Sequence, residues 1–375
     1  MMSGRKKSVI SKASPHTIKK FELIEEYIKS WAQKLLLTES CNGLIFIDCM
    51  CNSGVYTDDA GQLVKGTAVR VSEALREASR TYTEKNIHIY LNDKDKARID
   101  ELKKHLPQDE RNFKIVTSYS DAHELLRTIG PQLYGTGHLH YFLLYDPYDA
   151  TIDWEALLPF FRNWGEVMIN HMVSDPVRAI TSAKKKTTKA KYENTYLEDF
   201  EKLVPYGSDK KAYEARVEEI INSLKGARRY YVSAFPFYNT QNSLVYNLIH
   251  CTSNKEGFKL YKKSAWKVFG AQSSTKHSVE NRQLSFNLFG EITEVEDESC
   301  LHVIDIARYL QCCLKGHKQV PLDEMWKLLD NHPIFPSEGF RNDIKSELTG
   351  FFGAKIEQIV NHETGKKETV LSFSS

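Results

Sequence analysis

The stretch that decides the fold spans residues 44–56 and reads Leu-Ile-Phe-Ile-Asp-Cys-Met-Cys-Asn-Ser-Gly-Val-Tyr. Its first four residues are apolar, which favours a short buried strand of a parallel sheet. The strand ends on Asp48, and a loop of small and polar residues leads to a helix that begins near Thr67. This order of strand, loop and helix is how nucleotide-binding sheets present a cofactor site. The loop contains Gly54 where a dinucleotide fingerprint needs three glycines, which argues against a dinucleotide.

Strand and helix patterns alternate as far as residue 170. Further strands are predicted at 87–91, 113–117, 139–145 and 166–170, with helices at 67–79, 96–105, 121–129 and 154–162 between them. Such alternation indicates parallel strands joined by helices that cover both faces of the sheet. An amphipathic helix over residues 16–37, with Ser14-Pro15 at its start, precedes the first strand.

The strand patterns at 229–235 and 244–251 flank a short turn-rich connection and predict an antiparallel hairpin. With it, the α/β sheet becomes a doubly wound, mostly parallel, seven-stranded sheet.

Segment 176–191 is rich in lysine, and we interpret it as a loop. The predicted organisation is a basic disordered tail over 1–14, the α/β domain over 15–269, a polar linker over 270–299 and a winged-helix-like domain over 300–375. The last assignment rests on three helical patterns followed by a β-ribbon.

Bulk properties exclude several classes of protein. The 375 residues carry a net charge of +2, and no apolar run approaches the roughly 18 residues of a membrane span. The N-terminus lacks the apolar region of a secretory signal. Seven cysteines without metal-ligand spacing predict a protein of the reducing cytoplasm without a metal site.

Acidic residues follow the predicted strands at equivalent positions. Asp48, Asp93 and Asp146 end three strands, and Asp121 follows another. Because ligands bind beyond the carboxyl ends of strands in such sheets, these acids are candidate ligand contacts. Asp93 stands where an acid accepts hydrogen bonds from ribose hydroxyls. Asp121 could accept from an adenine amino group or, alternatively, cap the following helix.

These acids favour a cationic cofactor without a pyrophosphate. S-adenosylmethionine, with its sulfonium centre, fits both conditions. The end of the fourth strand adds Asp146-Pro147-Tyr148, which is similar to the tetrapeptide of amino-methyltransferases, in which an acid or amide holds the target amine and an aromatic ring stacks on a flipped base. One proline of that motif is missing here, and a strand-terminating turn is the alternative interpretation.

Several segments match one family in their order and spacing. They are Tyr27–Trp31, Phe46–Asp48, Asn52–Tyr56, Lys65–Ala68, Asn92–Asp95, Leu144–Tyr148, Ile169–Met172, Leu248–His250 and Ala265–Lys267. The chain resembles the three-Cys-motif partner protein family, whose fold is of the class I methyltransferase type. The resemblance spans about residues 15–269 and departs from the family at residues 49–52, where glycine or small residues are usual.

The resemblance implies a cofactor site and a partner. The cofactor, S-adenosylmethionine, would be held by Asp48, Asn52, Ser53, Gly54, Asp93 and Asp121. Asp146, Pro147 and Tyr148 would face the acceptor as the catalytic residues. The family name implies a protein partner with a three-cysteine motif.

Basic residues follow the fifth strand of the predicted sheet. They are Arg178, Lys184, Lys185, Lys186, Lys189 and Lys191. They could contribute salt-sensitive affinity for a nucleic-acid backbone, or they could form a solvated loop.

The leading hypothesis is an S-adenosylmethionine-dependent methyltransferase acting on nucleic acid, at a base amino group. The alternatives are an inactive methyltransferase-like binding module that partners another protein on nucleic acid and, disfavoured by the missing glycines, an NAD-dependent oxidoreductase.

Overall fold

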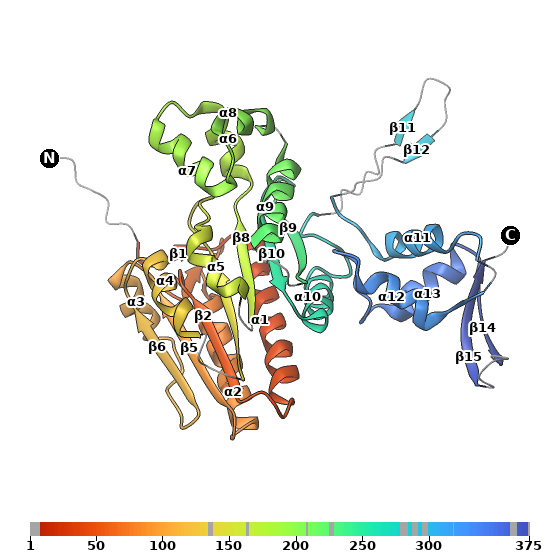
Figure 1. Cartoon of the computed structure of the whole chain (residues 1–375), viewed down its shortest axis with the longest axis horizontal. Coiled ribbons are helices and arrows are strands. Elements are labelled where there is room, and N and C mark those ends of the chain that lie inside the picture. The colour runs from red at the N-terminus through yellow and green to blue at the C-terminus, as the bar shows by residue number, and fades with distance from the viewer. Residues whose placement is uncertain are drawn as a thin grey trace. The chain divides into compact units, whose positions relative to one another are not determined.

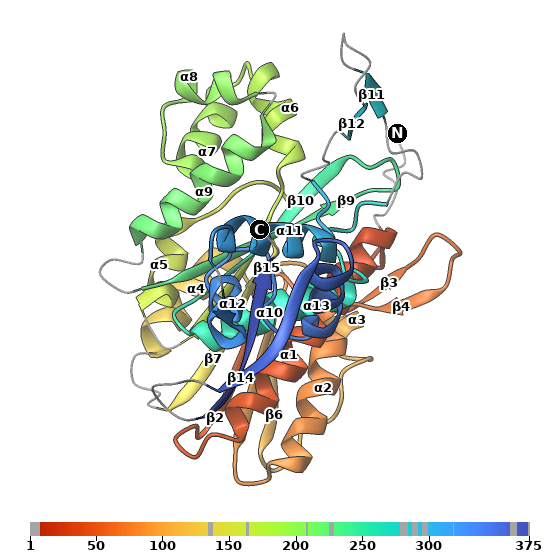
Figure 2. The same cartoon turned by 90° about the vertical axis from the view of Figure 1, so that its right-hand side faces the viewer.

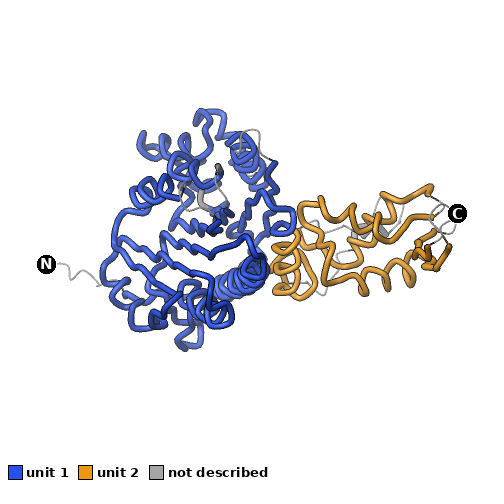
Figure 3. Tube along the Cα trace, turned by 60° about the horizontal axis from the view of Figure 1, so that its bottom comes forward, with its two compact units in different colours: residues 1–258 blue, residues 259–375 orange. Residues whose placement is uncertain are grey.

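The computed structural model describes residues 8–133, 138–162, 165–207, 209–224, 229–277, 284–286, 292–294, 299–317, 319–360 and 366–373. The chain divides into two compact units, residues 1–258 and 259–375 (Figure 3). No helix among the described residues is both long and apolar enough to cross a bilayer.

The first unit is built on a sheet of seven described strands (Figure 1). These are β2 Gly43–Asp48, β5 Asn86–Asn92, β6 Phe113–Ser118, β7 Leu139–Tyr145, β8 Gly165–His171, β9 Tyr231–Tyr238 and β10 Leu244–Thr252. Their order is β6-β5-β2-β7-β8-β10-β9, and β10 runs antiparallel to both of its neighbours while the other pairs are parallel. This confirms the predicted doubly wound sheet of the class I methyltransferase type, including its C-terminal hairpin.

Helices cover both faces of the sheet because side chains alternate along each strand. Phe46 of β2 stacks on Phe142 of β7, and Trp31 meets Phe142 edge-on. On the opposite face, Ile45 and Ile47 join a buried cluster with side chains from α4, α5 and α9. The bounds of these helices are α1 Pro15–Leu36, α2 Thr67–Thr81, α3 Lys96–Leu102, α4 Ala122–Gln132, α5 Trp154–Arg162 and α9 Lys210–Leu224.

A small sheet lies beside the loop that follows β2. Its strands are β1 Ser11–Lys12, β3 Val55–Thr57 and β4 Leu63–Lys65, in the order β1-β3-β4. Ser11 pairs with Tyr56 and Lys12 with Thr57. The prediction of a disordered tail through residue 14 is therefore wrong for β1, because a long-range backbone pairing orders it. Residues 1–7 lie outside the described residues.

The lysine-rich segment after β8 is helical. It forms α6 Ser174–Ser182 and α7 Lys186–Tyr196, followed by α8 Phe200–Leu203. Figure 1 places these helices beyond the end of β8, and Figure 2 shows them gathered near α9. The prediction of a loop here is wrong. Tyr192 and Tyr196, four residues apart, bury one face of α7. The indole of Trp154 also donates a 2.7 Å hydrogen bond to the carbonyl of Thr195. Packing of this face offsets the repulsion among the lysines on the other.

The second unit begins inside α10 Lys255–Val268. Its described helices and strands after residue 300 are α11 Val303–Leu314, β13 Val320–Pro321, α12 Leu322–Asp330, α13 Arg341–Gly350, β14 Ala354–Val360 and β15 Lys367–Phe373. The strand order is β13-β15-β14. Lys262 is fully buried, and its ammonium donates to the carbonyls of Leu329, Asp330 and His332 at the end of α12. Within the predicted linker, β11 Leu284–Phe286 pairs antiparallel with β12 Ile292–Glu294.

Candidate active site

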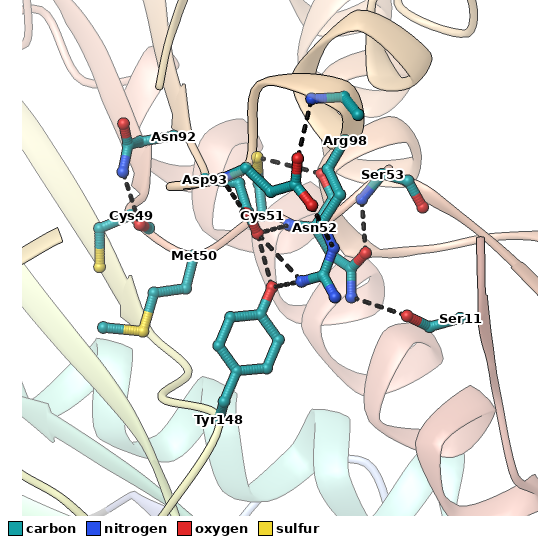
Figure 4. Close-up of polar contacts among 12 residues, drawn as sticks. Ser11, Cys49, Met50, Cys51, Asn52, Ser53, Asn92, Asp93, Arg98 and Tyr148 are labelled. Atoms are coloured by element: carbon teal, nitrogen blue, oxygen red, sulfur yellow. Dashed lines mark hydrogen bonds and ion pairs between the residues drawn. The ribbon is translucent and has the colours of Figure 1, made fainter. Parts of the chain in front are cut away.

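The loop after β2 folds back on the end of β5 (Figure 4). Asn52 adopts φ +57° and Gly54 φ +72°, and a Cβ on Gly54 would lie 2.3 Å from the Leu102 side chain. The loop therefore needs glycine at 54 and tolerates asparagine at 52. Its N–H groups are used internally: Cys51 donates to the Asn92 carbonyl at 2.8 Å, and Asn52 donates to Oδ2 of Asp93 at 3.2 Å. Such a loop does not offer these N–H groups to a phosphate.

Asp93 is the buried acid at the end of the second strand. Its carboxylate is 1% exposed. Oδ1 accepts a 2.9 Å hydrogen bond from the backbone of Asp95, and Oδ2 accepts from the Asn52 N–H and from the Tyr148 hydroxyl. A carboxylate that accepts several hydrogen bonds is held in one orientation, which is what recognition of a diol requires.

Arg98 of α3 and Tyr148 cover this carboxylate (Figure 4). The Tyr148 hydroxyl donates to Asp93 at 2.5 Å and accepts a hydrogen bond from Arg98. The Arg98 guanidinium lies 5.1 Å from the centre of the Tyr148 ring and 3.5 Å from Oδ2 of Asp93. Burial, followed by the bond to Asp93, raises the pKa of Tyr148 far above its ordinary value. The tyrosine is therefore a neutral donor at physiological pH.

A pocket of about 180 Å³ opens beside Asp93. It is lined by Cys49, Met50, Asp93, Lys94, Asp121, Ala122, His123, Pro147, Tyr148, Asp149 and Thr151. Of the residues predicted for the cofactor site, Asp93 and Asp121 line this pocket, and of those predicted to face the acceptor, Pro147 and Tyr148 do. Asp48, Asn52, Ser53, Gly54 and Asp146 do not line this pocket. The mixture of an apolar wall and a few carboxylates is typical of a small-ligand site.

Asp121 has the capping role that was the alternative to an adenine contact. It is the N-cap residue of α4, and Oδ1 accepts hydrogen bonds from the backbone of His123 at 2.9 Å and of Glu124 at 3.2 Å. The same residue lines the pocket. His123, which the sequence analysis did not single out, also lines it and lies 2.9 Å from the Tyr145 hydroxyl through Nε2.

Asp48 is buried at the end of β2. Its Oδ1 accepts a 3.2 Å hydrogen bond from the Met50 N–H. Burial, and then the nearby charge of Asp146, raise the pKa of Asp48 to about 8, against the lowering effects of the Met50 bond and of Lys20. Asp48 is therefore mostly protonated at pH 7, and a cation bound beside it would favour its ionised form.

Asp146 is bound on both sides by side chains that are not among the predicted site residues. Its Oδ2 lies 2.5 Å from the Lys20 ammonium, and its Oδ1 accepts a 2.6 Å hydrogen bond from the Asn170 amide. Lys20 belongs to α1 and is 6% exposed. Asp146 and Tyr148 do not converge in this structure, since Tyr148 turns to Asp93 and Asp146 to Lys20.

The predicted nucleic-acid-binding residues lie on and between α6 and α7. Lys184, Lys185 and Lys186 are exposed, as is Arg178. Lys191 forms a 2.6 Å ion pair with Asp149. The ammonium of Lys189 lies 4.6 Å from the centre of the Phe200 ring. Among the described residues, no group of three or more His, Cys, Asp or Glu side chains is placed to hold a metal ion.

Comparison with known proteins gives no family assignment. No family model matches the chain, and no curated protein matches it. Among solved structures it is similar to Trm1 from Pyrococcus horikoshii in complex with S-adenosyl-L-methionine, at 12% identity and a TM-score of 0.37, over 70% of this chain and 62% of that one. The chain thus spans less than two thirds of Trm1.

Two further similarities are equally distant. Protein LPL1258 from Legionella pneumophila matches at 10% identity and a TM-score of 0.39, over 66% of this chain and 92% of that one. Loganic acid methyltransferase with SAH matches at 10% identity and a TM-score of 0.31, over 72% of this chain and 88% of that one. Similarities at this level do not indicate an activity. The evidence for the fold is the order of the strands in the sheet.

Proposed function

We propose that this protein binds S-adenosylmethionine at the carboxyl end of the main sheet and transfers its methyl group to nucleic acid. The observation that supports the proposal most is the buried carboxylate of Asp93 beside the pocket. An acid at the end of the second strand is the group that accepts hydrogen bonds from ribose hydroxyls in doubly wound sheets.

The other residues around Asp93 fit the rest of this cofactor. Met50 and Ala122 offer the pocket apolar contacts for an adenine ring, and Asp121 also lines it. Asp48 lies outside the lining of this pocket and is mostly neutral without a ligand, and it would ionise if the sulfonium and ammonium groups of the cofactor reached the end of β2. The loop between β2 and β3 uses the N–H groups of Cys51 and Asn52 internally, which suits a cofactor without phosphates. Bound there, the cofactor supplies an electrophilic methyl group.

Nucleic acid as the acceptor is supported by the exposed cations of α6 and α7, because phosphate contacts through lysine and arginine supply sequence-independent affinity. The element order of the second unit, with its three-stranded β13-β15-β14 sheet, also fits the winged helix expected from the sequence, which would help to hold the substrate. The three-Cys-motif partner resemblance adds a protein partner to this proposal. The acceptor predicted from Asp146-Pro147-Tyr148 is a base amino group.

A second candidate function is a methyltransferase-like binding module without turnover. It is favoured by the contacts of the two central acids: Asp93 is covered by Tyr148 and Arg98, and Asp146 is paired with Lys20. In such a module these contacts would persist and no cofactor would displace them.

Calorimetric titration of the full chain tests the proposal. Saturable heat is expected with S-adenosylmethionine and with its product, S-adenosylhomocysteine, and none with NAD⁺. Heat with the two sulfur compounds but no transfer of a labelled methyl group to RNA or DNA would favour the binding module. Absence of heat at millimolar cofactor would refute cofactor binding.

A further inference from the structure

The side chain that meets Asp146 is a buried lysine. The Lys20 ammonium lies 2.5 Å from Oδ2 of Asp146 and 5.2 Å from the centre of the Tyr246 ring. Tyr246 is itself buried, and its hydroxyl donates to the carbonyl of His16 at 3.1 Å. The lysine is therefore held at the end of β7 by a carboxylate and an aromatic face, both of which attract a cation.

Asp146 is the accessible member of this group. Its side chain is 25% exposed, whereas those of Lys20 and Asn170 are buried. Asn170 donates its amide to Oδ1 at 2.6 Å, so each carboxylate oxygen already has one donor. A carboxylate has about four lone-pair positions, so about two remain, which is enough for a donor from a substrate.

The donors and acceptors of this group discriminate between acceptor atoms. The amino group of a nucleobase donates hydrogen bonds but accepts poorly, because its lone pair is delocalised into the ring. Beside Asp146 it would meet the Lys20 ammonium, which also only donates. A hydroxyl group can donate to Asp146 and accept from Lys20 at once. An atom that satisfies both side chains is preferred, because a group beside the buried Lys20 that cannot accept a hydrogen bond leaves a donor unpaired.

We infer that the acceptor atom is a hydroxyl oxygen and that, within nucleic acid, it is the ribose 2′-hydroxyl of RNA. This inference rests on the proposed methyltransferase function and replaces the base amino group expected from the local motif. The 2′-hydroxyl is the group that distinguishes an RNA strand from a DNA strand. The exposed cations of α6 and α7 would bind the phosphates of either strand, so the discrimination lies at Lys20 and Asp146.

With S-adenosylmethionine as the methyl donor, the reaction would balance as follows. Asp146 accepts the hydroxyl proton while the acceptor oxygen forms its bond to the methyl carbon and the carbon–sulfur bond breaks. The electron pair of that bond goes to sulfur, which leaves as a neutral thioether, and the proton passes from Asp146 to water. Lys20 stabilises the negative charge that develops on the oxygen. Asn170 orients Asp146 and is a positioning residue.

The test uses RNA and DNA oligonucleotides of one sequence with methyl-labelled S-adenosylmethionine, followed by digestion to nucleosides. The expected products are 2′-O-methyl nucleosides from RNA and no labelled nucleoside from DNA. Lys20→Met, which keeps the apolar stem and removes the charge, should lower transfer by about 100-fold or more. Lys20→Arg should restore part of it. Lys19→Met, at the exposed neighbouring position, is the matched control and should leave transfer unchanged.

Equilibrium binding adds a readout that does not depend on turnover. With S-adenosylhomocysteine present, RNA should bind more tightly than DNA of the same sequence, and Lys20→Met should reduce that preference in protein that circular dichroism shows to be folded. Methyl groups on base nitrogens, or equal transfer to DNA, would overturn the hydroxyl assignment and leave the methyltransferase proposal standing. Cofactor binding without transfer to either strand would overturn both the hydroxyl assignment and methyl transfer, and absence of cofactor binding would overturn the proposed function itself.

Discussion

The Tyr148 hydroxyl donates a 2.5 Å hydrogen bond to Oδ2 of Asp93, the oxygen that also lies 3.5 Å from Arg98. In this arrangement the tyrosine occupies a hydrogen-bonding position that a ribose hydroxyl would need. Binding of an adenosyl group therefore requires Tyr148 to give up its bond. Removal of the hydroxyl therefore changes the free energy of cofactor binding.

Tyr148→Phe should bind S-adenosylmethionine more tightly than the parent chain. The variant loses the competing hydrogen bond to Asp93 and keeps the ring, and one hydrogen bond of about 0.5–1.5 kcal/mol corresponds to a gain of roughly 2-fold to 10-fold in affinity. Calorimetry measures it. Weaker binding would mean that the hydroxyl contacts the cofactor rather than competing with it.

Asp48 makes folding stability depend on pH. Its folded pKa of about 8 lies above the ordinary value of 3.8, so the folded chain keeps a proton that the unfolded chain releases over this range. The stability that it contributes is complete at acid pH and is lost as the pH rises through about 8. Asp48→Asn removes this dependence, and its melting temperature relative to the parent chain should rise between pH 5 and 8. A constant difference would contradict the raised pKa.

The same residue should couple cofactor affinity to pH. A cationic cofactor needs Asp48 ionised, so its binding at pH 7 releases most of one proton from this residue. Affinity should increase from pH 6 to pH 8, and more steeply in the parent chain than in Asp48→Asn. Calorimetry in buffers of different ionisation enthalpy counts the protons. Identical pH profiles for the two chains would show that Asp48 does not face the cation.

Lys184, Lys185 and Lys186 should bind phosphates of the nucleic-acid backbone. Replacement of all three with serine should weaken binding of single-stranded RNA and lower the slope of log affinity against log salt by about 0.7 for each phosphate that is no longer neutralised. The matched control is Lys202→Ser, an exposed lysine of α8 that pairs with Glu198 at 3.0 Å. Binding measured by fluorescence anisotropy across a salt series tests it. An unchanged slope in the triple variant would exclude these lysines from the interface.

The regular part of the sheet could be predicted because its strands are continuous apolar runs with acids at their ends. The helix α7 could not, because its lysines outnumber the two tyrosines, Tyr192 and Tyr196, that bury it. The strand β1 depends on pairing with residues 56 and 57, a long-range interaction that no local pattern reveals.

The contact of Lys20 with Asp146 is not among the sequence predictions. Its charge made it resemble the preceding basic tail, yet it stands four and seven residues before Ile24 and Tyr27, on the buried face of α1. A lysine at an apolar position of an amphipathic helix is the signal that would have identified it. Arg98 gave no such signal, because an arginine on a short polar helix is ordinary on a protein surface.

The proposed function depends most on the carboxylate of Asp93 receiving the ribose of S-adenosylmethionine. Calorimetric titration of Asp93→Asn tests this directly, with Asp100→Asn as its matched control. Asp100 is an exposed acid of α3 that pairs with Lys96. We expect Asp93→Asn to lose about 10-fold to 100-fold in affinity, as for a hydrogen bond to a charged group, and Asp100→Asn to bind as the parent chain does. Equal affinity of the two variants for the cofactor would contradict the account.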